Sequence, residues 1–442
     1  MPDISMPWGK DELTVSLPDN WTVQQTAEPA SRPADPDWPD RLGGALTEPA
    51  TGLSLSRLLA IHRGEKVVMI LEDMTRHSPL PEILRIVMRE VEHAGVKRDK
   101  LELVFASGMH PPMTPREVAA KIGPAMTRLP WRCNPWHDHK AYEVIGRVGR
   151  MDVRIDRGVL EAGLRIIISS VSVHLQAGFG GGYKMLLPGC ASLDTIRQLH
   201  RLGLRNAQHQ LVGSEAARNP MRQAIDAAGE LLEGRGGDNF AIQYLLDARN
   251  MPSFIAAGEV ITTQRMLAKQ CSVATGVLID NPADVLIANA HPRDHDLWQS
   301  FKCIANTRWA CRPDGVIICL TRCEAAMQGM RVPRWPISPA WMRRIMCRLG
   351  ADAVTSLITR LVPRLAGDAA FFVRMASQTL QRNPLVMVSP ILHATGGKFP
   401  GLEVVPSMDQ AVAYSRRIIG DGPQRVTVFP FGGTTYPIPP SK

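Results

Sequence analysis

Short, nearly continuous apolar runs alternate with longer amphipathic stretches along much of the chain. The apolar run from Val67 to Leu71 is followed by a helical pattern from Pro81 to His93 and by a second apolar run from Leu101 to Ala106. Strands buried on both faces have such runs, and parallel strands need a crossover connection, usually a helix. The pattern therefore predicts a βαβ unit within a parallel sheet.

The same alternation continues towards the C-terminus. A third apolar run covers Leu164 to Ser169, and we expect residues 28–52, rich in Pro, Asp and Gly, to form an extended surface segment. The further predicted helices lie at 213–233, 262–271, 295–311, 339–364 and 408–418, and the further strands at 284–290, 315–321, 385–389 and 425–430.

These elements predict an α/β fold made of two α/β domains, with mainly parallel sheets and a cleft between the domains. The length of 442 residues allows two or three domains. We expect residues 1–265 to form an N-terminal domain and residues 266–442 to form a C-terminal domain that closes the substrate cleft.

Composition and charge narrow the class of protein. The net charge is +9, but the basic residues are scattered, and with five tyrosines there is no basic and aromatic surface for nucleic acid. The positive net charge suits a small anionic substrate. The eight cysteines contain no CxxC pair, so we expect them to be reduced. The chain lacks a leader pattern and an apolar stretch of about 20 residues, which predicts a cytoplasmic protein without membrane contact.

Candidate site residues follow the predicted strands. Asp73 and Arg76 come directly after the first strand, and His110 lies in the loop that joins the second strand to a helix opening at Thr114. Open α/β sheets bind ligands at the carboxyl ends of their strands. Arg76 could clamp a substrate carboxylate with two hydrogen bonds, or it could form a buried ion pair with Asp73.

A glycine-rich loop is the least ordinary segment of the chain. Gly178, Gly180, Gly181 and Gly182 precede Lys184, without the spacing of a P-loop or of a dinucleotide fingerprint. Such a loop can cradle a phosphate, or it can be merely flexible beside a solvated lysine. A lysine in a phosphate-binding cleft can bond covalently to a cofactor.

Histidines supply further candidates. His174 precedes the glycine loop and His200 follows it. A single histidine of this kind is more often structural, but together with His110 they form a set of candidate functional residues near the predicted cleft. His137 and His139 could bind a metal, although Asp138 between them could equally cap a turn. In the second half, Gln299 and Lys302 lie three residues apart on one predicted helix face, beside Trp298.

Taken together, these motifs resemble the nickel-pincer lactate racemase family in order and spacing, from about residue 65 to about residue 325. The block from His174 to Gly189 is highly specific. The matching set is Asp73-x-Thr75-Arg76, Gly108-x-His110, His137-Asp138, His174-x-x-Ala177-Gly178-Phe179-x-Gly181-Gly182-x-Lys184-x-x-x-Pro188-Gly189, His200 and Gln299-x-x-Lys302.

The resemblance implies an isomerase that racemises or epimerises a 2-hydroxy acid such as lactate or malate. It implies a pyridinium mononucleotide with two thiocarboxyl arms that chelate nickel, linked to Lys184, and cofactor-biosynthesis proteins as partners. His200 would be the remaining nickel ligand, and His110 and His174 would be the catalytic acid and base. The glycine loop, with Gly178, Gly180, Gly181 and Gly182, would contact the cofactor, and the substrate would be positioned by Asp73, Arg76, Trp298, Gln299 and Lys302.

Some positions depart from the family pattern. Met109 and Pro111 stand where threonine and arginine are expected, Trp298 replaces a tyrosine, and Tyr183 replaces a small or polar residue. The catalytic set is intact, so these departures indicate an altered pocket and leave the choice of 2-hydroxy acid open.

Two other enzyme classes use parts of the same residue set. Lys184 could form a Schiff base with pyridoxal phosphate, with the glycine loop on the phosphate. Alternatively, His137 and His139 with a third ligand could form the zinc site of a hydrolase.

Overall fold

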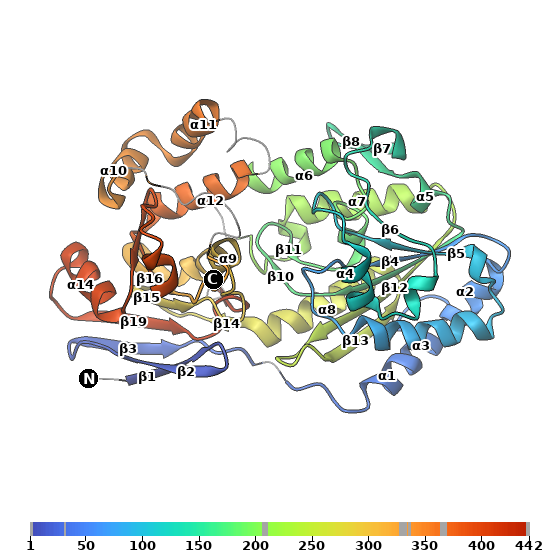
Figure 1. Cartoon of the computed structure of the whole chain (residues 1–442), viewed down its shortest axis with the longest axis horizontal. Helices are drawn as coiled ribbons and strands as arrows, with labels where there is room; N and C mark the ends of the chain where they lie inside the picture. The colour runs from blue at the N-terminus through green and yellow to red at the C-terminus, as the bar shows by residue number, and fades with distance from the viewer. Residues whose placement is uncertain are drawn as a thin grey trace. The chain divides into compact units, whose positions relative to one another are not determined.

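A computed structural model describes residues 3–30, 32–205, 211–326, 334, 337–362 and 369–438. The chain forms two compact units (Figure 1). Unit 1 contains residues 1–30, 206–213 and 275–442, and unit 2 contains residues 31–205 and 214–274.

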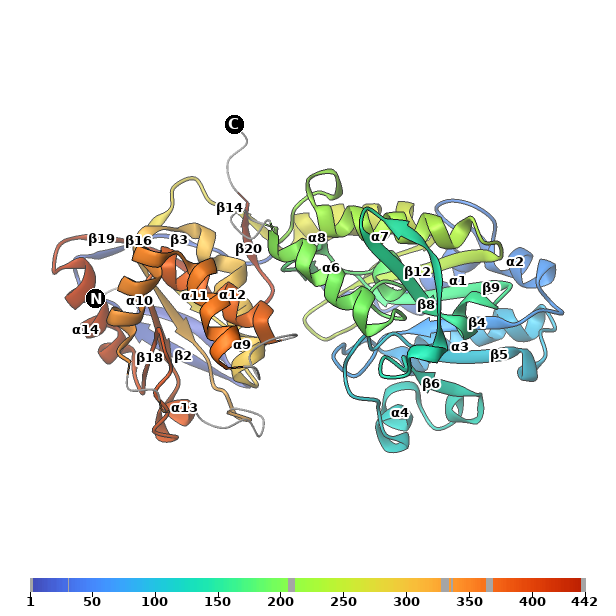
Figure 2. The same ribbon diagram turned by 90° about the horizontal axis from the view of Figure 1, so that it is seen from above.

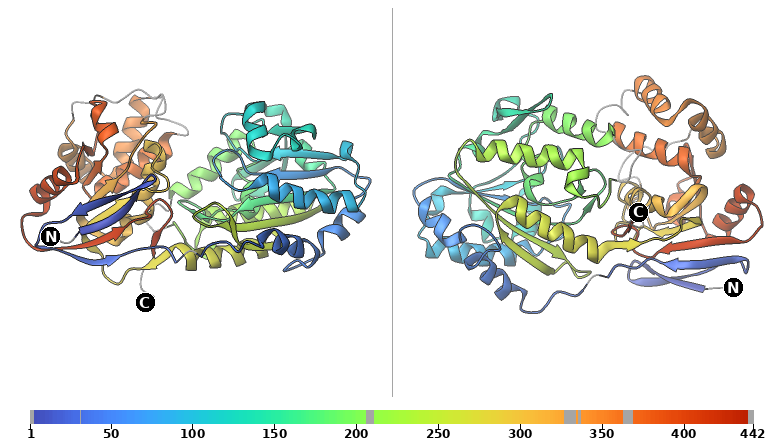
Figure 3. Two further views of the ribbon diagram at one scale, coloured as in Figure 1. Left: turned by 60° about the horizontal axis from the view of Figure 1, so that its bottom comes forward. Right: turned by 180° about the vertical axis from the view of Figure 1, so that it is seen from behind.

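This division differs from the predicted one, which had a single boundary after residue 265. The first 30 residues join the C-terminal part because β3 (Trp21–Thr26) pairs in parallel with β19 (Gln424–Phe429). The blue N-terminal strands and the red strand β19 lie together in both views of Figure 3. Strand pairing across about 400 residues leaves no signal in the local sequence pattern, so it was not predicted.

Unit 2 is built on a six-stranded sheet in the order β13-β12-β9-β4-β5-β6. All neighbours are parallel except β13, which runs antiparallel to β12 at one edge. The strands are β4 (Val67–Leu71), β5 (Leu101–Phe105), β6 (Trp131–Cys133), β9 (Leu164–Ser170), β12 (Asp238–Leu246) and β13 (Pro252–Gly258).

Helices cover both faces of this sheet, which explains its apolar runs. In β4, Met69 points into the core on one face, and Val68 and Ile70 point into the core on the other. Figure 1 shows the sheet between α3 and α7. The helices of the first face are α1 (Trp38–Thr47), α2 (Leu55–Ile61), α3 (Leu80–His93) and α4 (Pro115–Ile122). Those of the second face are α5 (Arg157–Leu160), α6 (Leu193–Arg205), α7 (Pro220–Glu233) and α8 (Val260–Thr275).

Two local predictions have clear outcomes in unit 2. The helix expected to open at Thr114 is confirmed, since Thr114 and Glu117 form a reciprocal capping box across the first turn of α4. The expectation of an extended segment over residues 28–52 is wrong, because α1 occupies part of it. Trp38, Leu42 and Leu46 lie on one face of α1 and are buried, so tertiary packing outweighs the unfavourable local composition.

Unit 1 contains a second six-stranded sheet, in the order β18-β17-β16-β15-β19-β3, and all of its neighbours are parallel. Its other strands are β15 (Ala283–Asn289), β16 (Cys311–Leu320), β17 (Leu385–Val388) and β18 (Leu402–Val405). One face is covered by the hairpin β1 (Asp3–Trp8) and β2 (Asp11–Ser16) together with α14 (Met408–Ile419). The other is covered by α9 (Leu297–Thr307) and α13 (Pro390–Ala394).

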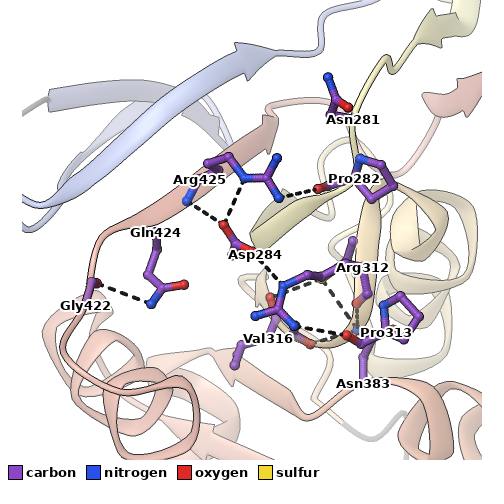
Figure 4. A network of polar contacts seen from close by, with 12 residues as sticks. Asn281, Pro282, Asp284, Arg312, Pro313, Val316, Asn383, Gly422, Gln424 and Arg425 are labelled. Atoms are coloured by element: carbon purple, nitrogen blue, oxygen red, sulfur yellow. Dashed lines mark hydrogen bonds and ion pairs between the residues drawn. The ribbon is translucent and has the colours of Figure 1, made fainter.

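One half-buried carboxylate links three strands of this sheet at the end where they begin. Asp284 in β15 accepts hydrogen bonds from Arg312 Nε at 2.6 Å and from the backbone N of Arg425 at 2.9 Å (Figure 4). Burial opposes ionisation of Asp284, but these arginines outweigh it and lower its pKa to about 2. The contacts link β15, β16 and β19 where the strands begin.

The remaining elements refine the predictions. The helical pattern over 339–364 divides into α10 (Pro339–Leu349) and α11 (Ala351–Leu361), because Gly350 between them has a φ of 83°. They pack with α12 (Ala369–Arg382). The helix expected over 213–233 begins only at Pro220. The small sheets are β7 (Tyr142–Val148) with β8 (Met151–Asp156), β10 (Val173–His174) with β11 (Gly178–Phe179), and β14 (Gly276–Leu278) with β20 (Tyr436–Ile438).

Figure 2 shows the helices of the two units in a second view. Within the described residues, none of these helices has the length and apolar character needed to cross a membrane. The α/β class with mainly parallel sheets is confirmed, whereas the cleft between the domains stays a prediction.

Candidate active site

The candidate residues of unit 2 gather where its strand order reverses. Along the chain, β4, β5 and β6 are added in one direction, and β9 then returns to the other side of β4. The carboxyl ends of β4 and β9 therefore flank a topological switch point, where open α/β sheets bind ligands. Asp73 follows β4 and His174 lies shortly after β9.

Asp73 is a buried carboxylate with partners for both oxygens. Its Oδ2 lies 2.5 Å from His110 Nδ1, and its Oδ1 accepts from Thr75 N at 3.0 Å and Thr75 Oγ1 at 2.5 Å. Burial raises the pKa of Asp73, but the hydrogen bonds from His110 and Thr75 outweigh burial and lower it to about 2. Asp73 therefore orients His110 and is ionised.

Arg76 is not the ion-pair partner of Asp73 among the contacts of the described residues. Its Nη1 donates to Thr75 O at 3.2 Å and to Thr75 Oγ1 at 3.1 Å. The half-buried Arg76 side chain is thus hydrogen-bonded within the turn after β4. The ion-pair interpretation is wrong, and the interpretation as a substrate clamp stays a prediction.

Two buried residues that sequence reasoning missed support this turn. Lys121 Nζ donates to Arg76 O at 2.6 Å. Glu72 Oε1 accepts from the backbone N of Ser170 at 2.5 Å, which joins the ends of β4 and β9, and Glu72 also bonds the hydroxyl of Ser78. A glutamate and a lysine at the ends of apolar patterns carry little local signal, because such residues are usually exposed.

The loop of His110 is joined to the loop of Lys184. Gly108 N donates to Gly189 O at 3.0 Å, and Gly189 N donates to Lys184 O at 3.2 Å. Asn134 Nδ2 donates to Gly108 O at 2.8 Å from a buried position. These bonds place the two predicted functional loops side by side.

His174 is held in a tight turn. Its Nδ1 accepts hydrogen bonds from the backbone N of Gln176 at 3.2 Å and of Ala177 at 3.1 Å. The turn closes the short pair β10–β11, in which His174 is opposite Gly178. The imidazole ring therefore has a defined orientation, half-buried at the edge of the sheet.

The glycine loop is buried and packed against protein, and its role in cofactor binding stays a prediction. Gly180 N donates to Ser172 O at 2.7 Å, and Gly182 N donates to Gln243 Oε1 at 2.8 Å. These two amides are therefore occupied. A Cβ at Gly178 would lie 2.3 Å from Ser214 O, so glycine here permits close packing.

A buried arginine secures the same loop from its carbonyl side. Arg222 in α7 is 1% exposed and donates to the carbonyl oxygens of Phe179, Gly180 and Gly181. Asp226 balances its charge one helical turn away. The loop that leads to Lys184 is therefore hydrogen-bonded to a buried side chain through three of its carbonyl oxygens.

Lys184 lies in the 3₁₀ turn η4 (Gly182–Met185) and is half-buried. The neighbouring Tyr183, one of the departures from the family pattern, is fully buried and bonds Glu233 of α7. Its ring lies against Gly229, where a Cβ would approach within 2.0 Å. Tyr183 is therefore a core residue.

His200 lies in α6 and is half-buried. Gln176 Nε2, next to the turn of His174, donates to His200 O at 3.4 Å, so the two segments are in contact. In contrast, His137 and His139 are exposed, and Asp138 caps the 3₁₀ turn η3 (His139–Ala141) by accepting from Lys140 N at 3.0 Å. The capping interpretation of Asp138 is confirmed.

The second set of predicted residues lies in unit 1. Gln299 and Lys302 share one face of α9, and Lys302 Nζ donates to Gln299 Oε1 at 2.6 Å. The predicted placement of these two residues on one helix face is confirmed. Trp298 is in the same helix, but its side chain lies outside the described residues.

A metal site formed by protein side chains alone has no support among the described residues. Within the described part of the chain, no group of three or more His, Cys, Asp or Glu residues could hold a metal ion. This argues against a zinc hydrolase built on His137 and His139. The eight cysteines are free thiols, as expected.

Two imidazoles, a lysine and an arginine near the switch point of an α/β sheet are typical of an enzyme site. Residues 8–212 match the family of the lactate racemase N-terminal domain. The lactate racemase of Thermoanaerobacterium thermosaccharolyticum is 25% identical over 348 residues, which are 76% of this chain and 78% of that protein. The lactate racemase of Lactiplantibacillus plantarum is 23% identical over 326 residues, 71% of this chain and 73% of that protein.

Solved structures agree on the fold. The lactate racemase apoprotein from T. thermosaccharolyticum superimposes with a TM-score of 0.82 and 21% identity, covering 99% of this chain and 100% of that one. A protein from Thermotoga maritima gives a TM-score of 0.61 at 16% identity, with coverage of 92% and 100%. Residues 8–212 thus match the N-terminal domain of the lactate racemases, and the chain is similar in sequence to these proteins over most of its length. This is a family of isomerases.

Proposed function

We propose that the chain is a racemase or epimerase of a 2-hydroxy acid and uses a nickel-pincer pyridinium cofactor linked to Lys184. The observation that carries the proposal is the set of His110, His174 and Lys184 on contacting loops and neighbouring strand ends of one sheet. The relationship to lactate racemases supports the reaction type. Lactate and malate are the first substrates to test.

The residues of unit 2 fit such a cofactor. Lys184 is half-buried on the turn η4, and His200 lies on the helix that contacts the turn of His174. The cofactor brings sulfur and carbon ligands of its own, so one imidazole, that of His200, completes the donor set, and soft sulfur with imidazole suits nickel. This agrees with the absence, within the described residues, of a protein-only metal cluster.

When bound, the cofactor would supply an electrophilic ring carbon that takes a hydride and returns it. The chain supplies the proton chemistry and the positioning. His110 and His174 would each serve one enantiomer as base and the other as acid at the substrate hydroxyl. Arg76, Gln299 and Lys302 would bind the carboxylate and other polar groups of the substrate.

A label at C2 of the substrate tests the proposal. Protein from a host that makes the cofactor is given one enantiomer deuterated at C2 in ordinary water, and the recovered acids are examined by mass spectrometry. We expect both enantiomers to retain deuterium, because a hydride does not exchange with solvent. A carbanion mechanism, including one with pyridoxal phosphate, would lose the label on most turnovers.

Matched variants separate binding from chemistry. Arg76→Lys is expected to keep nickel and raise KM, because a point charge cannot replace a bidentate contact. His110→Gln is expected to lower kcat without loss of nickel. Racemisation with loss of label, or no racemisation of any 2-hydroxy acid by the nickel-loaded protein, would refute the proposed function.

A further inference from the structure

The two imidazoles of the candidate site have partners of opposite kind. A carboxylate holds His110, whereas two backbone amides hold His174. We infer that His110 and His174 are held in opposite neutral tautomers, so that His110 presents an unprotonated Nε2 and His174 presents a protonated Nε2. The inference rests on the proposed function in that it assigns each imidazole a different part in the same reaction.

The contact of His110 defines its tautomer. Asp73 is 7% exposed, and its other oxygen already accepts from the amide and hydroxyl of Thr75. An ionised carboxylate accepts hydrogen bonds and donates none. The hydrogen in the 2.5 Å contact must therefore belong to His110 Nδ1. A neutral imidazole carries one hydrogen, so His110 Nε2 retains its lone pair.

The contacts of His174 define the opposite neutral tautomer. Backbone amides can only donate, and those of Gln176 and Ala177 both point to Nδ1, at 3.2 Å and 3.1 Å. Nδ1 must then be an acceptor, and the hydrogen of the neutral ring is on Nε2. A hydrogen on Nδ1 would face two donors, so the turn opposes the other tautomer.

The difference has a chemical consequence at the substrate oxygen. His110 is prepared to take the hydroxyl proton at Nε2, and the resulting imidazolium is stabilised by the Asp73 carboxylate. His174 is prepared to donate a hydrogen bond from Nε2. For His174 to act as a base, its Nδ1 must first give up both amide hydrogen bonds. Asp73 and the 176–177 backbone are therefore positioning groups for the two imidazoles.

Nuclear magnetic resonance of the imidazole nitrogens tests the inference directly. The full chain is labelled with ¹⁵N-histidine, and long-range ¹H–¹⁵N spectra are recorded at a pH where the rings are neutral. His110→Gln and His174→Gln assign the signals, and the exposed His139 serves as a reference for a solvent-averaged ring. We expect a protonated Nδ1 in His110 and a protonated Nε2 in His174. The same tautomer in both rings, or averaging in either, would overturn the inference.

The variant Asp73→Asn provides a second test of the tautomer of His110. The side-chain amide of asparagine can donate to Nδ1, so His110 is expected to change to the tautomer protonated at Nε2, while His174 is unchanged. A His110 signal that does not change in Asp73→Asn would remove Asp73 as its positioning residue. The spectra need neither cofactor nor substrate. A protein that shows opposite tautomers but no racemase activity would therefore refute the proposed function and leave this inference standing.

Discussion

At the scale of single residues, a buried carboxylate and a lysine have the clearest consequences. Asp73 loses its hydration on folding, and the hydrogen bonds from His110 and Thr75 compensate for this loss. Lys184 is placed by a loop whose backbone groups are bonded to other parts of unit 2. Asp73 stabilises the fold and orients His110, and we propose Lys184 as the site of cofactor attachment.

Asp73→Asn should reduce the free energy of unfolding in a pH-dependent way. The pKa of Asp73 falls from 3.8 to about 2 on folding. Its ionised form therefore stabilises the protein above pH 4, and the effect is lost as the pH falls from about 4 to about 2. We expect a loss of about 2 kcal/mol at pH 7, since each pKa unit corresponds to about 1.4 kcal/mol. Urea unfolding at several pH values measures this, and a difference that grows on acidification would contradict it.

Lys184→Ala should abolish covalent attachment of the cofactor. His200→Ala is the matched control, since it should lower nickel content and keep the adduct on Lys184. Intact-mass spectrometry and metal analysis of protein from a cofactor-producing host measure both effects. An adduct that persists on Lys184→Ala would exclude this lysine as the attachment site.

At the scale of elements, the glycine loop shows why a motif and its packing must be considered together. Gly178 has a φ of 72°, and a Cβ there would meet the backbone oxygen of Ser214. Gly149 has a φ of 59°, but nothing lies within 4 Å of its Cβ position. The two glycines therefore separate backbone strain from steric overlap.

Gly178→Ala should destabilise the chain more than Gly149→Ala. The positive φ costs both variants about 1 to 2 kcal/mol, and the overlap with Ser214 adds about 1 to 3 kcal/mol to the first. Urea unfolding of the two variants gives the comparison. Equal losses would show that the loop moves away from Ser214 without cost.

At the scale of the whole molecule, the N-terminal segment belongs to the unit formed by the C-terminal part. Trp21 in β3 is 1% exposed and packs in the core of the unit 1 sheet. Trp341 in α10 is 53% exposed and provides a matched control in the same unit. Removal of each indole therefore tests which segment stabilises unit 1.

Trp21→Ala should destabilise unit 1 by about 3 to 5 kcal/mol, whereas Trp341→Ala should change stability by less than about 0.5 kcal/mol. Hydrogen exchange followed by mass spectrometry locates the effect. We expect faster exchange in β15 and β19 and unchanged exchange in β4 and β9. Faster exchange in the sheet of unit 2 instead would contradict the assignment of residues 1–30.

The sequence by itself determined the local elements and the identity of the candidate residues. Apolar runs define strands such as Val67–Leu71 because a strand buried on both faces needs them, and the capping box at Thr114 depends only on neighbouring residues. The pairing of Gln299 with Lys302 follows from helical spacing alone. Motif order was sufficient for the relationship to lactate racemases.

Tertiary structure decided everything that depends on contacts between distant segments. The pairing of β3 with β19, the burial of Tyr183 against Gly229 and the occupied amides of Gly180 and Gly182 each involve a partner far away in the chain. The hydrogen-bond partner of Asp73 also depends on tertiary structure, because the fold brings His110, and not the nearby Arg76, to its carboxylate. Local sequence specifies which groups a residue can bond, and the packing of the chain determines which of them come within reach.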